Sequence, residues 1–418
     1  MNRRHFLKTS VLSASAIATA SLGLSGARAA SVTPSGRIHY VAPEARGDGS
    51  GRNRENPAKW SDRAFRDEVY DALEQDDVTM FFLNGTYYVS SEEEKELPSF
   101  SFRNTGHERH RLILRGESPK GVWLARHPDD PDRGNQGPDL LEFRDCHNVS
   151  ISRLNFTAPE NQWMDYPVRF TRCQEILVDS CSWVDIPNAH YGATGVHREE
   201  SDRVTYRNCR FVRIGRRGGA HMAYNAWAPR RTAYIHCLFE DCAGDYVRFR
   251  SGSEYNIVAG CVFRSTGNHV NEHMPFISVP VFNPEGRGET FGTNFLIFDN
   301  IFIYATEARP ATRIAFLFHH SGYNPPGRRH LLDAGEAEVL RSGSVDARRE
   351  LLEKNLGVDT SKVHVFNNRY RNVAHRGVYR MHPRYGAESE IGDALFDIDD
   401  TFSSEAVVEN PGESLGYY

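Results

Sequence analysis

The chain has 418 residues, of which 39% are hydrophobic and 25% are charged, and this hydrophobic share is enough for a narrow continuous core. The formal net charge of −5 and the lack of any basic tail or stripe argue against a protein that binds nucleic acid. Arginine supplies 44 of the 50 cationic side chains, which suits an anionic ligand because its planar fork binds carboxylate and sulfate, although a genome-wide preference for arginine explains the bias equally well.

Residues 1–29 have the pattern of a twin-arginine signal peptide. Arg3 and Arg4 precede a mildly apolar stretch of Ser, Ala and Leu, and the small-x-small pattern at residues 27–29 is typical of a cleavage site. The stretch is too weakly apolar for a transmembrane helix, and we expect no membrane span elsewhere. Because this route exports folded protein, we expect the mature chain to work in the periplasm or outside the cell.

Residues 30–78 predict a short strand followed by a helix. The strand lies at residues 40–43, and a glycine-rich turn at residues 47–51 follows it. Phe65, Val69 and Leu73 then recur at helical spacing. We expect this helix to cover the open N-terminal end of the structure that follows.

An apolar-x-apolar-x-x-small-x-aromatic pattern recurs between residues 148 and 263. Val149, Ile151, Leu154 and Phe156 show it first, and the small position returns after 27, 28, 28 and 24 residues. A fixed period of this size indicates a solenoid, and the alternation of period 2 indicates strands. The small position is then filled by Cys181, Cys209, Cys237 and Cys261.

These observations predict an all-β fold, a single-stranded right-handed parallel β-helix over residues 79–375, forming one domain and a monomer. The repeated cysteines should form a stacked interior ladder of buried thiols, in preference to a disulfide or a metal site. Long insertions are expected at about 268–293 and 320–360, where the spacing breaks. Residues 376–418 form an acidic and weakly patterned C-terminal tail.

The chain resembles the pectate-lyase-like superfamily over about residues 38–375. The resemblance rests on Tyr-Val-x-Pro at residues 40–43, on Phe-Leu-x-Gly-Thr-Tyr at residues 82–87, and on the repeat. It implies a β-helix polysaccharide lyase, hydrolase or epimerase. An Asp-Asp pair after a Gly, as in the related hydrolases, and the Asp-Pro-His-Asp motif of the epimerases are absent. Related lyases use a lysine beside an arginine, but no lysine occurs at residues 121–353, so lyase chemistry needs another base here.

Four titratable residues follow the aromatic position of successive repeats, namely His190, His221, Asp245 and His269. Because coils stack in register, we expect these four side chains to form one column on a wall of the solenoid. The alternation in residues 245–250 places Val247 and Phe249 inward and therefore predicts that Tyr246, Arg248 and Arg250 face solvent beside this column.

β-Elimination from a uronic acid polymer needs a neutralised carboxylate, a base and an acid. Arg248 and Arg250 are predicted to bind the carboxylate, His221 or His269 to act as the base, and Tyr224 to act as the acid. The alternative for the histidines is that they only hydrogen-bond turn backbone. The predicted substrate-binding residues are Arg250, His190, Asn225, Asp245, Trp227 and Arg217, with Asn225 alternatively pointing inward.

No cofactor is predicted, but calcium, the other means of neutralising a carboxylate in this superfamily, is possible. Glu240, Asp241 and Asp245 are its weak candidate ligands, although Glu240 and Asp241 should lie on opposite sides of one strand. The leading interpretation is an exported polysaccharide lyase acting on an anionic polysaccharide. The alternatives are a glycoside hydrolase using Asp245 with Asp185 or Asp241, or a surface solenoid that binds glycans without catalysis.

Overall fold

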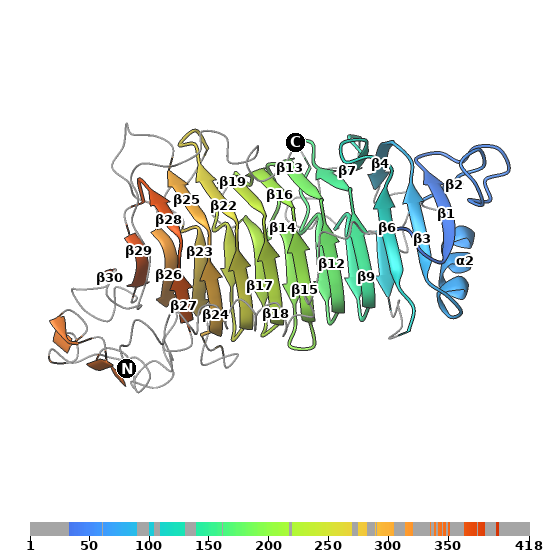
Figure 1. The fold of residues 1–418 in the computed structure, drawn as a ribbon. Helices are drawn as coiled ribbons and strands as arrows, with labels where there is room; N and C mark the ends of the chain where they lie inside the picture. Colours follow the sequence, from blue (N-terminus) through green and yellow to red (C-terminus); the bar gives the residue numbers. More distant parts are fainter. Residues whose placement is uncertain are drawn as a thin grey trace. The chain divides into compact units, whose positions relative to one another are not determined.

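The computed structural model describes residues 33–60, 62–89, 100–103, 109–129, 139–160, 162–216, 220–269, 275–281, 289, 291–304, 314–320, 363–373, 375–380 and 390–392, with isolated positions between 335 and 351. Within these residues the chain winds through three β-sheets whose strands lie side by side in successive coils (Figure 1). Each complete coil adds one strand to each sheet, and the pairing within every sheet is parallel apart from the last pair of the third sheet. The prediction of a parallel β-helix is confirmed.

The first sheet contains, in spatial order, β2 (Ala58–Lys59), β1 (Arg37–Ala42), β3 (Val78–Phe82), β6 (Leu112–Gly116), β9 (His147–Ser152), β12 (Gln174–Asp179), β15 (Asp202–Arg207), β18 (Arg230–Ile235), β21 (Glu254–Ala259), β24 (Thr293–Phe298) and β27 (Val363–Phe366). The second sheet contains β4 (Gly85–Val89), β7 (Val122–Arg126), β10 (Asn155–Thr157), β13 (Ser182–Ile186), β16 (Arg210–Ile214), β19 (Leu238–Cys242), β22 (Val262–Ser265), β25 (Ile301–Tyr304) and β28 (Arg369–Arg371). The third sheet contains β5 (Phe100–Arg103), β8 (Leu141–Arg144), β11 (Val168–Thr171), β14 (Gly192–His197), β17 (His221–Ala226), β20 (Val247–Phe249), β23 (Ile277–Val281), β26 (Ile314–His320), β29 (His375–Arg380) and β30 (Glu390–Gly392).

The core follows from the alternation of the repeat. Along a strand every second side chain points into the coil, and the register places like positions directly above one another. The aromatic position forms a stack through the second sheet, in which the ring of Trp183 lies 5.0 Å from that of Phe156 and 4.5 Å from that of Phe211. All three rings are fully buried, so the repeated aromatic residue is a core residue.

The turn between the first and second sheets explains the small residue of the repeat. The residue before it takes a left-handed conformation, as at Ser180 (φ 56°) and Asn208 (φ 54°). The next side chain then points inward, and Cys209 donates its thiol hydrogen to the carbonyl of Val178 (3.5 Å). All seven cysteines are buried and free, which confirms the predicted thiol ladder.

Asparagine takes over this ladder in the later coils. Asn300 accepts from the backbone N–H of Cys261 (2.9 Å) and donates to the carbonyl of Val258 (2.9 Å), and Asn368 repeats the arrangement one coil further on. An amide side chain satisfies both a donor and an acceptor of the turn backbone, which a thiol does only weakly.

The N-terminal segment contains the helix α2 (Arg63–Leu73), which packs against β3 beside β1 (Figure 1). Asp62 caps the helix by accepting from the backbone N–H of Ala64 (2.9 Å). Phe65, Val69 and Leu73 are buried in the core, as their spacing predicts.

Other segment predictions fall partly or wholly outside the described residues. The signal peptide does so completely, and the insertion at 320–360 does so except for isolated helical positions. The predicted insertion at 268–293 contains β23, a regular strand of the third sheet. Strands β29 and β30 place part of the predicted tail in that sheet as well. No helix among the described residues has the length and apolar character needed to cross a membrane.

Candidate active site

Polar and aromatic side chains gather on the outer face of the third sheet, over strands β8 to β23. Phe170 and Phe249 mark the inward positions of β11 and β20, so the residues beside them point outward. By register, one outward row runs along successive strands. It consists of Ser101, Glu142, Arg169, Gly195, Tyr224, Arg248 and Ser278.

Tyr224 lies at the centre of this face, among three of the predicted site residues. Its ring stacks on the imidazole of His221, with centroids 5.4 Å apart. The guanidinium of Arg248 lies over the same ring, 5.8 Å from its centroid, and Arg250 donates to the phenol oxygen (2.9 Å). The prediction that these four residues share one wall therefore agrees with the structure.

Asp245 holds this group together from the adjoining coil. Its carboxylate accepts from the Nε of Arg248 (2.6 Å) and from the hydroxyl of Ser278, and it is fully buried. Its backbone N–H donates to Nδ1 of His221 (3.0 Å). Since Nδ1 is an acceptor, a neutral His221 carries its proton on Nε2, which suits a hydrogen-bond donor better than a base.

The predicted column of four titratable groups forms only in part. His221 and Asp245 adjoin, but the Nε2 of His269 donates to the carbonyl of Gly215 (2.8 Å), in the turn after β16. His269 thus ties down a turn of an earlier coil, which is the structural alternative for this residue. His190 lies at the edge of the site, with its ring edge-on to that of Tyr191 (4.1 Å).

Two side chains predicted to face outward point into the coil instead. Asn225 is fully buried, donates to the carbonyl of Arg248 (3.0 Å) and accepts from the hydroxyl of Tyr234 (3.0 Å), so its predicted role in substrate binding is wrong. Tyr246 is also fully buried, and its hydroxyl donates to the carbonyl of Arg264 (2.9 Å). Tyr246 precedes β20 and lies in the turn, where the alternation of a strand does not apply.

The two remaining predicted substrate-binding residues have different outcomes. Trp227 follows β17, is half-buried, and meets His197 edge-on with ring centroids 4.9 Å apart. Arg217 lies outside the described residues.

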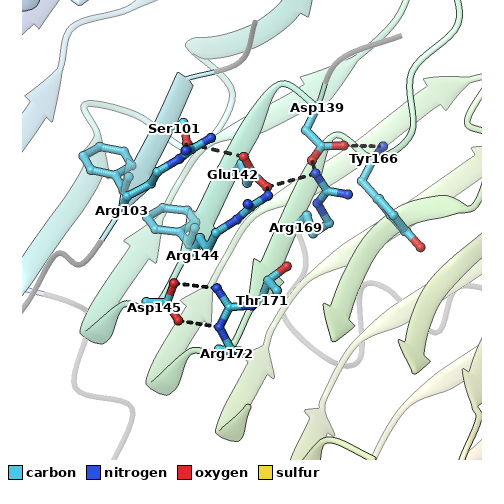
Figure 2. A network of polar contacts seen from close by, with 12 residues as sticks. Ser101, Arg103, Asp139, Glu142, Arg144, Asp145, Tyr166, Arg169, Thr171 and Arg172 are labelled. Carbon is cyan, nitrogen blue, oxygen red and sulfur yellow. Dashed lines mark hydrogen bonds and ion pairs between the residues drawn. The ribbon is translucent and has the colours of Figure 1, made fainter. Parts of the chain in front are cut away.

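An ion-pair network that the repeat did not reveal adjoins the site on its N-terminal side. Figure 2 shows Arg169 between the carboxylates of Asp139 (2.7 Å) and Glu142 (2.9 Å), with Arg144 also bound to Glu142 (2.7 Å). The second oxygen of Asp139 accepts from the backbone N–H of Tyr166 (3.0 Å). Burial raises the pKa of Asp139 to about 7, although Arg169 opposes this effect.

Tyr166 and His197 form a neutral pair between this network and Tyr224. Burial lowers the pKa of His197 to about 3 and raises that of Tyr166 well above its ordinary value, so neither group is charged at neutral pH. The hydroxyl of Tyr166 lies 3.1 Å from Nε2 of His197, and we assign the phenol as the donor. Extending the outward row to β8 and β11 was the signal that could have revealed Glu142 and Arg169, but not this pair.

The weak candidate calcium ligands do not converge. Glu240 pairs with Arg264 (3.2 Å), whereas Asp241 accepts from the backbone N–H (2.8 Å) and the hydroxyl (2.7 Å) of Thr266. Both belong to β19 of the second sheet and are bound to residues of the next coil, while Asp245 precedes β20 of the third sheet. Among the described residues, no group of three His, Cys, Asp or Glu side chains is arranged to hold a metal ion.

The carboxylates considered for hydrolysis also lie apart. Asp185, at the exposed end of β13, is bound by the guanidinium of Arg213 through two contacts (2.5 and 2.8 Å). Asp241 holds the turn at Thr266, and Asp245 is enclosed between Arg248 and Ser278. A facing pair of carboxylates does not form from these three residues.

No protein-family model matches the chain, and no curated protein matches it. Among solved structures, an alginate lyase from Paenibacillus is 14% identical over 61% of this chain and 91% of its own, with a TM-score of 0.42. The pectate lyase Pel9A is 10% identical over 73% of this chain and 74% of its own, with a TM-score of 0.45. PfbA, a surface adhesin of Streptococcus pneumoniae, is 10% identical over 77% of this chain and 82% of its own, with a TM-score of 0.41. Similarity at this level does not distinguish an enzyme from an adhesin.

Proposed function

We propose that this protein is an exported polysaccharide lyase that cleaves a uronic-acid-containing polysaccharide by β-elimination on the outer face of the third sheet. One observation supports this proposal above the others. The phenol of Tyr224 is stacked on His221, lies under the guanidinium of Arg248 and accepts from Arg250. A proton-transfer group is thus surrounded by donors of the kind that bind a carboxylate.

Each requirement of elimination has a group in this arrangement. Arg248, Arg250 and the Nε2 hydrogen of His221 neutralise the carboxylate next to C5, which makes the C5 hydrogen acidic. The step requires the phenolate of Tyr224, whose oxygen takes that proton while the C4–O bond breaks and the C4–C5 double bond forms. The same proton then passes to the departing glycosidic oxygen, so that Tyr224 acts as both base and acid. Arg250 holds the phenol oxygen in place through both steps.

The roles of His221 and Tyr224 therefore differ from those that the sequence suggested. A base at His221 would need a free lone pair on Nε2, but the contact of Nδ1 with the backbone of Asp245 places the proton on Nε2. Tyr224 takes over the proton transfer that the sequence had assigned to a histidine. The twin-arginine leader supports export of the folded protein to the periplasm or the medium.

The test is turnover of a panel of uronic acid polymers, followed by the ultraviolet absorbance of the unsaturated product and by reducing ends. If both signals rise, the reaction is elimination; reducing ends alone indicate hydrolysis, and neither signal with retained binding indicates a glycan-binding solenoid. Tyr224→Phe should lower kcat at least about 100-fold, since it removes only the oxygen that carries the proton. Tyr255→Phe, at an exposed site on the first sheet, is the matched control and should leave kcat unchanged.

A further inference from the structure

We infer that the bound glycan crosses the coil, parallel to the strands of the third sheet, and contacts Tyr191, Tyr224 and Trp227 in turn. This inference rests on the proposed function, and it adds two sugar-binding subsites on either side of Tyr224. It also differs from the usual expectation for a solenoid, in which a polymer follows the row of equivalent side chains from coil to coil.

Tyr191 forms the first subsite. Its side chain remains 43% exposed, yet it is supported from below by the buried Tyr166, whose ring is nearly parallel at 5.7 Å and 21°. Its ring is also nearly parallel to that of Tyr224, at 6.4 Å and 8°, and His190 meets it edge-on. Three rings, among them the phenol that carries out the chemistry, therefore hold the exposed ring of Tyr191 in place. A rigid exposed ring of this kind binds the apolar face of a sugar at little entropic cost.

Gly195 makes this arrangement possible. It occupies the outward row between Arg169 and Tyr224, and a Cβ at this position would lie 2.9 Å from Cε1 of Tyr166. The ring of Tyr166 thus fills the space left by the missing side chain, and Tyr191 rests on it.

Trp227 forms the second subsite, at the opposite end of β17. It occupies a turn position that is left-handed in the neighbouring coils too, where Arg198 (φ 81°) and Ser251 (φ 59°) stand. Trp227 adopts φ 62°, and so bulky a side chain is uncommon in that conformation. The repeat thus holds the half-buried indole at a fixed turn position, at the end of the strand that carries Tyr224.

A cavity of about 770 Å³ adjoins this indole and extends towards the phenol of Tyr224. Trp227 and Glu289 both line it. Glu289 pairs with Arg250, and Arg250 donates to Tyr224. The cavity is therefore separated from the phenol by one ion pair, and its volume is within the range of ligand-binding pockets.

The spacing along the strands suits an oligosaccharide. Gly192 pairs with His221, so Tyr191 lies level with Ala220, seven residues before Trp227. The rings of Tyr191 and Tyr224 are 6.4 Å apart, and that of His197 lies 5.8 Å from Tyr224 and 4.9 Å from Trp227. The two subsites are therefore at most about 17 Å apart, with Tyr224 between them. Several sugar residues are needed to span this distance.

Along the row of described residues the axial direction offers no comparable aromatic surface. Towards the N-terminus the outward row continues into the buried Glu142 and the ion pairs of Arg169 (Figure 2). Towards the C-terminus it continues into Ser278, which is fully buried against Asp245. Ion pairs at one end of this row and a buried hydroxyl at the other leave the contacts for a polymer across the coil.

The test measures binding of uronate oligosaccharides of increasing length to the full mature chain carrying Tyr224→Phe, by calorimetry, so that no turnover occurs. Tyr191→Ala and Trp227→Ala should each weaken binding of the longest oligosaccharide about tenfold, and each should abolish part of the gain in affinity with length. Arg144→Gln changes a partly exposed residue in the axial direction, and Tyr255→Ala removes an equally exposed tyrosine of another sheet; both should stay within about twofold.

The opposite result separates the two proposals. The crossing path is wrong, and the proposed function stands, if the Tyr224→Phe chain binds the oligosaccharides and this binding is weakened by Arg144→Gln but not by Tyr191→Ala or Trp227→Ala. If the unmodified chain neither binds nor cleaves any member of the panel, the proposed function and the path fail together.

Discussion

Replacing His197 with glutamine should remove a large part of the acid sensitivity of this protein. His197 is buried, lies 3.1 Å from the hydroxyl of Tyr166 and contacts the rings of Tyr224 and Trp227. Burial, aided by Arg169 and Arg198, lowers its pKa from 6.5 to about 3. The folded state therefore keeps this imidazole neutral at pH values where the unfolded chain protonates it.

The sign of the effect follows from proton binding. Between pH 6.5 and about 3 the unfolded chain binds one more proton at this site than the folded chain, so the stabilising contribution is complete above pH 6.5 and is lost as the pH falls. Each pH unit in this window is worth about 1.4 kcal/mol, so the loss at about pH 4 is about 3 kcal/mol. Glutamine keeps an acceptor for Tyr166 but does not titrate.

The assay is urea denaturation of the parent and His197→Gln at about pH 7 and pH 4, followed by tryptophan fluorescence. The free energy of unfolding should fall by about 3 kcal/mol more in the parent than in the variant. His127→Gln, at a side chain that is 40% exposed, controls for the loss of one histidine. Equal pH dependence in the parent and His197→Gln would refute the view that the imidazole is held neutral in the fold.

Three further predictions concern the same wall and the core. Asp139→Asn should become more stable relative to the parent as the pH rises from about 4 to 7, by up to about 4 kcal/mol in denaturation experiments. The reason is that the raised pKa of Asp139 favours the folded state only while its carboxyl is protonated. A difference in unfolding free energy between the two chains that does not change with pH would contradict this. Gly195→Ala should destabilise by about 1–3 kcal/mol and lower affinity for oligosaccharides, since its Cβ displaces Tyr166, and unchanged affinity would show that Tyr191 does not depend on that ring. Asn300→Ala should cost about 1–3 kcal/mol for each of two buried backbone groups left without a partner, against about 1 kcal/mol for Cys237→Ala, and equal losses would contradict the role assigned to the asparagine.

The fold was predictable because its information is local and repeated. Alternation of period 2 indicates which side chains of a strand point inward. The recurrence of Cys181, Cys209 and Cys237 indicates which strands lie one coil apart. The register of the third sheet then follows, which is why His221, Tyr224 and Arg248 were found together.

The rest of the site depends on residues outside the strands. Tyr166 and Tyr191 precede β11 and β14, and the rings of loop residues are placed by packing and not by a pattern. The same limit explains the wrong predictions: Tyr246 lies in a turn, and His269, which follows β22, contacts Gly215 of an earlier coil. Asn225 was misassigned because a polar side chain on a strand was assumed to face solvent. Its amide instead points inward, where it hydrogen-bonds the carbonyl of Arg248 and the hydroxyl of Tyr234.

The buried thiols allow local opening of the coils to be measured by cysteine labelling. All seven cysteines are free and enclosed, and Cys146, Cys173, Cys209, Cys237 and Cys261 mark five successive coils. An alkylating reagent should therefore reach each sulfur only when its own coil separates from the next. Mass spectrometry of the labelled peptides would give, in one experiment, the order in which the coils separate from one another, starting from either end.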